Sequence, residues 1–365
     1  MSELAEFGRF FLPGPTEVLP QVLEAQVQAM IGHRGKAMER LIEELEPGLK
    51  TVFQTTRPVY ISSSSATGLM EGAVRNGALR RVLSLVNGAF SDRFYRIARA
   101  TGLEVEPLTV EWGQVNTPEA LAAALRSGDY DAVTVVHSET STGVLNPIRE
   151  LAATAHAAGD VVLLVDSVSG IAGAEVQTDA WELDFVLTGS QKALALPPGL
   201  AFGVANARVL ARAERKTDRG TYFDFLEFEK SIGKNQTPNT PALSLFYALD
   251  EQLRRIQAEG IANRWARHAA MAASVYRWVD ELRGRGLELE ILAPAPYRSP
   301  TVTCIRLPAP YTGPQVNNAM KDRGYTIATG YGKLKESSIR IGHMGDHTVV
   351  ETEALLGVLA EVLSA

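Results

Sequence analysis

The chain has 365 residues, of which 45% are hydrophobic and 21% charged, and its formal net charge is −6. These proportions are typical of a globular enzyme that is large enough for two domains. The acidic balance excludes the basic surface that binding to nucleic acid or to an anionic membrane requires.

Cysteine content and the terminal segments bear on the compartment in which the protein works. The single cysteine, Cys304, excludes an internal disulfide and is typical of a reducing compartment. No apolar run approaches the ~20 residues that cross a membrane. Met1 to Phe11 lacks the basic cluster of a signal or transit peptide, and Leu363 to Ala365 is not a peroxisomal signal. We therefore expect a cytoplasmic protein.

Short apolar runs rich in β-branched residues alternate with helical patterns through the first two thirds of the chain. This alternation predicts an α/β fold with a mostly parallel sheet. The expected strands are 59–61, 82–86, 132–136, 161–165, 184–188 and 200–204. The expected helices between them are 67–79, 92–101, 118–126 and 148–158.

A different pattern begins after Thr240. Helices are expected at 241–259, 261–283, 313–323 and 349–363, and strands at 287–291, 301–307 and 338–342. This order predicts a small C-terminal α+β domain. We divide the chain into an N-terminal arm (1–20), a large domain (21–258) and a small C-terminal domain (259–365). Because no linker rich in Gly and Ser is present, we expect the two domains to pack together.

One lysine and one aspartate follow buried apolar strands. Lys192 lies in a small polar loop after 185–187, with no carboxylate within three residues. Burial without a partner lowers the pKa of an ammonium group, as a Schiff-base lysine requires at neutral pH. Asp166 ends the run 161–165, where carboxyl ends of parallel strands face the ligand crevice. Together they predict a pyridoxal phosphate (PLP) site, with Lys192 for the aldehyde and Asp166 for the pyridine nitrogen.

The segment Gly-Ser-Gln-Lys-Ala-Leu at 189–194, followed by Pro-Pro-Gly at 197–199, resembles the cofactor-lysine motif of class V aminotransferases of fold type I. Further matches are Val165 to Val168, Leu12 to Thr16 and Ile339 to Gly342. Within that class, the alanine/serine–glyoxylate (or pyruvate) branch is the most similar. The resemblance implies a PLP-dependent transaminase with a ping-pong Schiff-base mechanism. It also implies a large domain with a mostly parallel sheet, a small C-terminal α+β domain and a homodimer with shared active sites.

A phosphate site is expected where Ser65, Ala66 and Thr67 open a helix after a strand. Backbone N–H groups and hydroxyls there meet the positive end of the helix dipole, which suits an anion. The resemblance places the same three residues on the phosphate-binding positions, although the family often has Gly and His where Ala66 and Thr67 stand. Gln191 and Val168 are further cofactor neighbours by the same resemblance.

Two more cofactor contacts come from the resemblance. Phe90 stands where the family stacks an aromatic ring on the pyridine, and Thr140 where a hydroxyl meets the phenolic oxygen. Glu139 is expected to be a structural hydrogen-bond acceptor and not an acid–base catalyst. His137 is either a packed histidine at a strand end or a cofactor neighbour.

The remaining site residues lie far apart in the sequence. Arg340 lies between isoleucines, and its planar fork suits the α-carboxylate of a substrate, the use the family makes of this position. By resemblance, Thr240 and, less strongly, Thr237 reach the cofactor phosphate of a partner subunit. Thr240 before a proline is also good helix-capping chemistry by itself. His33 and Arg34 resemble the pair that meets the substrate phosphate in phosphoserine aminotransferases.

The predicted reaction moves an amino group between alanine or serine and glyoxylate or pyruvate. Phosphoserine aminotransferase is the second hypothesis, although the second His-Arg pair of those enzymes is absent near the C-terminus, where His343 and Lys333 could substitute. A third hypothesis, from another class, is a non-catalytic protein with this fold, but such proteins commonly lose the lysine, aspartate or arginine. A cysteine desulfurase is disfavoured because Cys304 lies within a strand.

The sequence indicates neither a nicotinamide site nor a metal site. The chain lacks the Gly-x-Gly-x-x-Gly of a nicotinamide-dependent oxidoreductase after its first strand. His343 and His347 are four residues apart but lie in a glycine-containing loop after a strand, so we assign no metal site.

Overall fold

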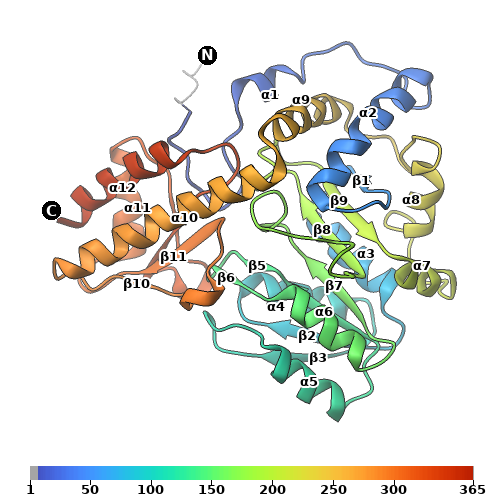
Figure 1. Ribbon diagram of the computed structural model, residues 1–365, viewed down its shortest axis with the longest axis horizontal. Helices are drawn as coiled ribbons and strands as arrows, with labels where there is room; N and C mark the ends of the chain where they lie inside the picture. The colour runs from blue at the N-terminus through green and yellow to red at the C-terminus, as the bar shows by residue number, and fades with distance from the viewer. Residues whose placement is uncertain (1–6, 365) are drawn as a thin grey trace.

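The structure is a computed structural model that describes residues 7–364. A large seven-stranded sheet with helices on both faces forms one part, and a four-stranded sheet with its own helices forms the other (Figure 1). Residues 1–6 of the proposed N-terminal arm, and Ala365, lie outside the described residues. Within 7–364, no helix has both the length and the apolar character that crossing a membrane needs.

The strand order of the large sheet is β1-β9-β8-β7-β4-β2-β3. In that order the strands are Tyr60–Ser62, Ala201–Ala205, Phe185–Gly189, Val162–Asp166, Ala132–Val136, Arg81–Val86 and Glu104–Thr109. All pairs from β8 to β3 are parallel, whereas β9 is antiparallel to both of its neighbours. The expected mostly parallel sheet is therefore confirmed.

The central strands are apolar because helices cover both faces of the sheet. Every residue of β4, β7 and β8 is buried, as in parallel sheets between two helical layers. The edge strand β3 was not among the expected strands. Its sequence contains Glu104, Glu106 and Pro107 and is largely exposed, so it has no apolar run. Pro107 is tolerated there because edge strands need fewer ladder hydrogen bonds.

Two hydrophobic cores lie on the two faces of this sheet. The first core holds side chains of α2 (Lys36–Phe53), α5 (Pro118–Ser127), α6 (Ile148–Ala157) and α9 (Leu243–Glu259). The second holds side chains of α3 (Ala66–Gly77), α4 (Ala89–Ala100), α7 (Ala207–Glu214) and α8 (Phe225–Ile232). Because each fully buried Leu, Val or Phe contributes ~1.5–3 kcal/mol, these two cores fix the sheet between its helices.

The small domain packs around a third core. Its sheet has the order β10-β11-β13-β12, and all its pairs are antiparallel. Its elements are α10 (Ile261–Gly284), β10 (Glu290–Ile291), η1 (Ala295–Tyr297), β11 (Val302–Arg306), α11 (Gly313–Asp322), β12 (Ala328–Thr329), η2 (Gly332–Leu334), β13 (Ser338–Gly342) and α12 (Val349–Ser364). Phe11, from the N-terminal segment, is buried in the same core.

The long helix α10 runs from the large domain along the small one (Figure 1). It follows α9 after Gly260, whose φ of +80° is readily available only to glycine. The proposed domain boundary after residue 258 falls just before this turn and stays a proposal. Three short elements complete the large domain: the helix α1 (Pro20–Glu24) and the two strands of an antiparallel hairpin, β5 (Ser138–Glu139) and β6 (Val144–Leu145).

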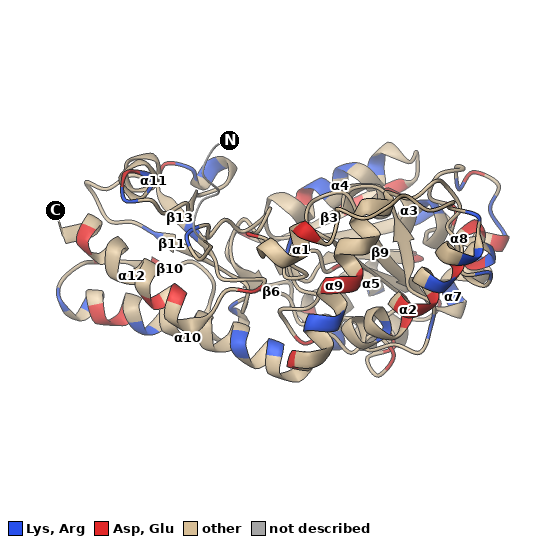
Figure 2. Cartoon of the chain, turned by 90° about the horizontal axis from the view of Figure 1, so that it is seen from above, with Lys and Arg blue, Asp and Glu red and all other residues tan. Residues whose placement is uncertain are grey.

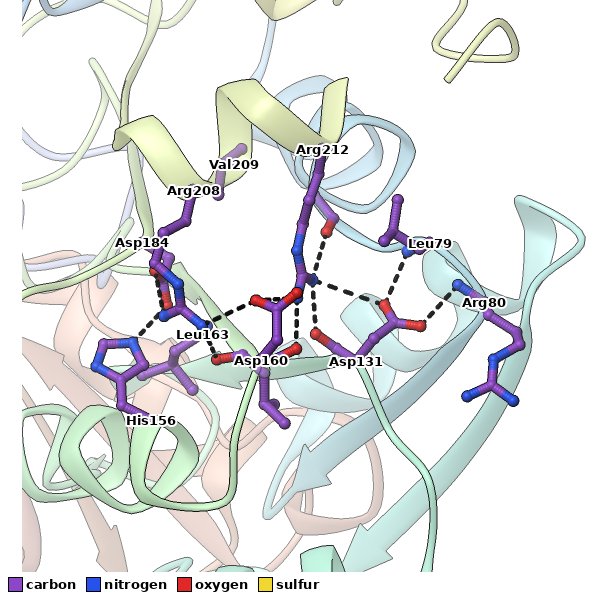
Figure 3. A network of polar contacts seen from close by, with 12 residues as sticks. Leu79, Arg80, Asp131, His156, Asp160, Leu163, Asp184, Arg208, Val209 and Arg212 are labelled. Carbon is purple, nitrogen blue, oxygen red and sulfur yellow. Dashed lines mark hydrogen bonds and ion pairs between the residues drawn. The ribbon is translucent and has the colours of Figure 1, made fainter. Parts of the chain in front are cut away.

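An ionic network closes the sheet at the amino ends of its strands (Figure 3). Arg212 of α7 donates to the carbonyls of Asp131 and Asp160 at 2.6 and 2.5 Å. The fully buried Asp184 accepts from His156 and Arg208 at 2.8 and 3.0 Å. The amino ends of the strands are thus filled by structural ion pairs. Elsewhere, charges of both signs are interspersed along the outer helices, α10 among them (Figure 2).

Candidate active site

A cavity of about 250 Å³ lies where β4 and β7 end and the loop after β8 begins. Nine of the residues expected from the sequence line it: Ser65, Ala66, Thr67, Phe90, Thr140, Asp166, Val168, Gln191 and Lys192. They come from loops that follow different strands of the same sheet. Because parallel strands present their carboxyl ends at one edge, the fold brings these separate segments to one place.

Lys192 lies in the loop after β8 with its side chain turned into the cavity. Only 7% of the residue is exposed, and burial, followed by the charge of Arg340, lowers the pKa of its amine from 10.5 to about 8. Its Nζ donates to the carbonyl oxygen of Pro13. A buried amine with a depressed pKa is the group that forms a Schiff base readily near neutral pH.

Asp166 is the last residue of β7 and lies in the same cavity. It is 2% exposed, and burial raises the pKa of its carboxyl from 3.8 to about 7. The backbone N–H of Val168 donates to Oδ1 at 2.8 Å and fixes the carboxylate. Such a group needs a cationic partner to be ionised at low cost, and a protonated ring nitrogen supplies one.

The amino end of α3 forms the third feature of the cavity. Ser65 is its N-cap, and Ala66 and Thr67 are its first helical residues. The first N–H groups of a helix have no acceptor within the helix and carry the positive end of its dipole. With the Thr67 hydroxyl and Gln191 beside them, these groups suit a phosphate dianion.

The three features together fit pyridoxal phosphate. The amine matches its aldehyde, the buried carboxylate matches its ring nitrogen, and the helix end matches its phosphate. Phe90, the second residue of α4, lines the cavity with the Nζ of Lys192 5.9 Å from the centre of its ring, and so presents an aromatic surface to a bound ring.

Glu139 is the structural acceptor that its sequence context predicts. It is fully buried and accepts from the backbone N–H groups of Phe90 and Ser91 at 3.2 and 2.9 Å. The hydroxyl of Ser141 donates to it at 2.6 Å. The carboxylate therefore fixes the start of α4, and an added Cβ at Gly88 would overlap it.

Two neighbours of Glu139 differ in their relation to the cavity. Thr140 lines it, and its hydroxyl lies 2.6 Å from that of Ser169. His137 is buried but does not line the cavity. Its Nδ1 lies 3.0 Å from the hydroxyl of Ser167. Burial lowers the pKa of His137 to about 3, so its ring is neutral. The packed strand-end histidine is the alternative that agrees with these contacts.

Arg340 in β13 of the small domain is not among the lining residues but contacts one of them, Thr140. Its Nε donates to the carbonyl of Thr329 at 3.0 Å, and its Nη1 to the carbonyl of Thr140 at 3.2 Å. The residue is 8% exposed, and burial lowers the pKa of its guanidinium. No carboxylate forms an ion pair with it in the described part of the chain. A buried cation of this kind suits a substrate carboxylate.

Five of the expected residues do not line the cavity of their own chain: Arg340, described above, and the four residues His33, Arg34, Thr237 and Thr240. Arg34 donates to the carbonyls of Thr237 and Pro238 at 2.6 and 3.1 Å. The Thr237 hydroxyl donates to the carbonyl of Asn239 at 2.7 Å. Thr240 is exposed, and His33 is partly exposed. The structure thus gathers the two segments 33–34 and 237–240, at a place separate from Lys192.

Eight residues that line the cavity were absent from the set expected from the sequence, and Gly14 and Arg93 are two of them. Gly14 lies against Lys192, inside the motif Leu12 to Thr16. Arg93 lies three residues after Phe90 on α4, a spacing that places two side chains on one helix face. That spacing is the sequence signal that identifies Arg93 once Phe90 is assigned to the site.

The two C-terminal histidines contact different parts of the molecule. His343 Nε2 lies 2.8 Å from the hydroxyl of Thr303. His347 stacks on the rings of Phe7 and Phe11, with centroids 5.4 and 4.2 Å away. Each ring therefore has its own structural partners.

Comparisons with known proteins identify the family of the chain. The family model for class V aminotransferases matches residues 13–331. An uncharacterized aminotransferase of Methanocaldococcus jannaschii is 37% identical over 340 residues, which cover 92% of this chain and 87% of that protein. A serine–glyoxylate aminotransferase of Methylorubrum extorquens is 32% identical over 366 residues, which cover 97% of this chain and 89% of that protein.

A solved structure extends the similarity to three dimensions. The alanine–glyoxylate aminotransferase of Nostoc sp. superimposes with a TM-score of 0.90 at 30% identity, covering 100% of this chain and 97% of that chain. The match spans both domains, as the fold described above requires. The chain belongs to the class V aminotransferases, PLP-dependent enzymes of fold type I.

Proposed function

We propose that the protein is a transaminase that moves an amino group between alanine or serine and glyoxylate or pyruvate. The observation that carries this proposal is that one cavity contains both Lys192 and Asp166. Lys192 is a buried amine with a lowered pKa, and Asp166 is a buried carboxyl with a raised pKa. Arg340 at the edge of the same site supplies a receptor for an α-carboxylate. The names of the relatives from Methylorubrum and Nostoc support the choice of substrates.

Each residue of the site has a separate role in the proposed reaction. Bound pyridoxal phosphate supplies an electron sink for the amino acid. Asp166 holds a positive charge on the ring nitrogen, and Arg340 orients the substrate through its carboxylate. Lys192 Nζ, once unprotonated, removes the Cα proton of the substrate as general base. Phe90 would offer its aromatic face to the cofactor ring.

The cofactor contacts follow from the lining of the cavity. The phosphate is assigned to Ser65, Ala66, Thr67 and Gln191, and the phenolic oxygen to Thr140. Val168 contributes the N–H that orients Asp166. These assignments rest on the chemistry of the groups and on their shared cavity.

The active unit is proposed to be a homodimer in which Thr240 and, less strongly, Thr237 reach the partner's phosphate site. Apolar side chains support this proposal, because Val27 and Met30 are 88% and 76% exposed. They lie in the segment between α1 and α2, which extends around the outside of the large domain (Figure 1). Arg34 joins the end of that segment to residues 237–238. A cytoplasmic location also stays a proposal, supported by the single, buried cysteine.

Phosphoserine aminotransferase is the second candidate. The observation in its favour is the exposed Arg34 beside the segment that carries Thr240. If the segment that carries Thr240 reaches the partner's active site, His33 and Arg34 lie at that site too. They would then form a cationic patch that binds a substrate phosphate.

A comparison of kcat/KM for alanine, serine and phosphoserine, with glyoxylate as acceptor, tests the proposal. We expect alanine or serine to be used at least as well as phosphoserine, and Lys192→Ala to abolish turnover with all three. A preference for phosphoserine by orders of magnitude that Arg34→Ala removes would establish the second candidate instead. Absence of transfer from every donor, in protein that retains bound cofactor, would favour the non-catalytic alternative.

A further inference from the structure

Arg93 is a cation of the cavity to which the proposed reaction gives no task. It lies on α4, lines the cavity, and its guanidinium carbon is 4.9 Å from the centre of the Phe90 ring. Its Nη2 lies 3.5 Å from the Tyr331 hydroxyl, a long contact that uses little of its donor capacity. Among residues 7–364, no carboxylate lies within ion-pair distance of it.

Tyr331 connects this arginine to Arg340. The guanidinium carbon of Arg340 is 5.4 Å from the centre of the Tyr331 ring, and the rings of Tyr331 and Phe90 are 5.3 Å apart. The two arginines therefore approach one tyrosine from two domains, since α4 belongs to the large domain and β13 to the small one. Both also act on Lys192, where each contributes to the lowered pKa of the amine.

With cofactor and substrate bound, most charged groups of the proposed site would have a partner of opposite charge. Lys192 would hold the aldehyde of bound pyridoxal phosphate, Asp166 its ring nitrogen, and the amino end of α3 its phosphate. Arg340 then binds the α-carboxylate of the substrate. Arg93 remains without an anionic partner when the donor is alanine or serine, because their side chains are neutral.

We propose that Arg93 is a specificity-determining residue that binds a second carboxylate, so that dicarboxylic amino acids are also amino donors. This inference rests on the proposed transaminase function and widens its donor class. The fork of five N–H donors in a guanidinium matches a carboxylate in two parallel hydrogen bonds. The partly buried site strengthens such a contact relative to one in water.

Binding of two unreactive acids to the holoenzyme tests the proposal without turnover. Succinate carries both carboxylates of aspartate and propionate carries only that of alanine, and neither has an amino group. We expect calorimetry at neutral pH to give roughly ten- to hundredfold tighter binding of succinate, the ratio that one charge-assisted contact supports. Arg93→Gln should bring this ratio close to one, and Arg93→Lys should retain part of it, because the charge stays while the fork is lost.

Arg96→Gln is the matched control. Arg96 lies three residues further along α4, is paired with Asp92 at 2.9 Å and is not among the residues that line the cavity, so this variant should keep the wild-type ratio. Equal affinity for the two acids in the wild type, or a ratio that survives in Arg93→Gln, would overturn the proposal. If Arg93→Gln does not fold, the wild-type ratio and Arg93→Lys still decide.

A single-turnover measurement separates the failure of this inference from that of the proposed function. Holoenzyme mixed with excess alanine should release one pyruvate per site, and with aspartate one oxaloacetate per site. If alanine, serine and aspartate all yield no product, the proposed transaminase function itself is refuted. Pyruvate from alanine with no oxaloacetate from aspartate refutes only the role of Arg93.

Discussion

At the scale of single residues, burial moves the two central ionisable groups toward neutrality from opposite sides. The pKa of the Lys192 amine falls from 10.5 to about 8, and that of the Asp166 carboxyl rises from 3.8 to about 7. In both, loss of hydration disfavours the charged form. Near neutral pH, therefore, part of the Lys192 population is the free amine and part of the Asp166 population is the carboxylate that can pair with a ring cation.

This lowered pKa predicts how the apoenzyme takes up its cofactor. Only unprotonated Lys192 bonds to the aldehyde, so the rate of capture should rise with pH and level off above about 8. Because the charge of Arg340 lowers the pKa of Lys192, Arg340→Gln should move the midpoint to higher pH. Stopped-flow absorbance of pyridoxal phosphate mixed with apoenzyme measures both midpoints. A wild-type midpoint near that of a free lysine would contradict the burial argument.

At the scale of elements, the N-terminal segment 12–16 closes the cavity over Lys192. The Thr16 N–H donates to the carbonyl of Gln191 at 2.9 Å, and Pro13 accepts from the Lys192 amine. Gly14 between them has a φ of +105°, and an added Cβ would overlap the Lys192 side chain. Glycine is required there for its backbone conformation and for the close approach.

Gly14→Ala should therefore impair the site more than the fold. We expect kcat/KM to fall by about tenfold or more, because Lys192 must move, while strain at a positive φ costs ~1–3 kcal/mol of stability. Gly357→Ala is the control, since Gly357 lies in α12 with no neighbour within 4 Å of an added Cβ. That exchange should leave activity unchanged and slightly raise the melting temperature. Normal turnover by Gly14→Ala would show that this segment does not constrain Lys192.

At the scale of the whole molecule, the separation of Thr240 from the cavity makes a prediction about assembly. If Thr240 acts across an interface, a heterodimer of Lys192→Ala and Thr240→Val subunits holds one site with both native residues. Random mixing of the two weak parents should then restore about a quarter of wild-type activity, because half of the dimers are mixed and each has one intact site. Activity after mixing, with heterodimers counted by native mass spectrometry, measures this. Heterodimers as inactive as their parents would place Thr240 in its own chain's site or in a structural role.

Local patterns identified the parts of the site that lie next to buried strands. Lys192, Asp166 and the loop 65–67 each follow a strand of the large sheet, and an apolar run is visible within a few residues. Elements without such a run were missed. The edge strand β3 has polar residues and a proline, and α2 contains Pro47 and Gly48, a pair typical of turns.

Neighbouring residues were enough to predict the α/β architecture, the mostly parallel sheet and the ionisable groups at its carboxyl edge, because strand burial and loop polarity are local properties of a segment. The folded structure was needed to show which distant groups meet at that edge. Arg340 meets the carbonyl of Thr140 from 200 residues away, and Arg93 meets the Tyr331 hydroxyl from 238 residues away. Contacts of this kind depend on how the two domains pack, and the hydrophobic periodicity of a single segment does not predict them.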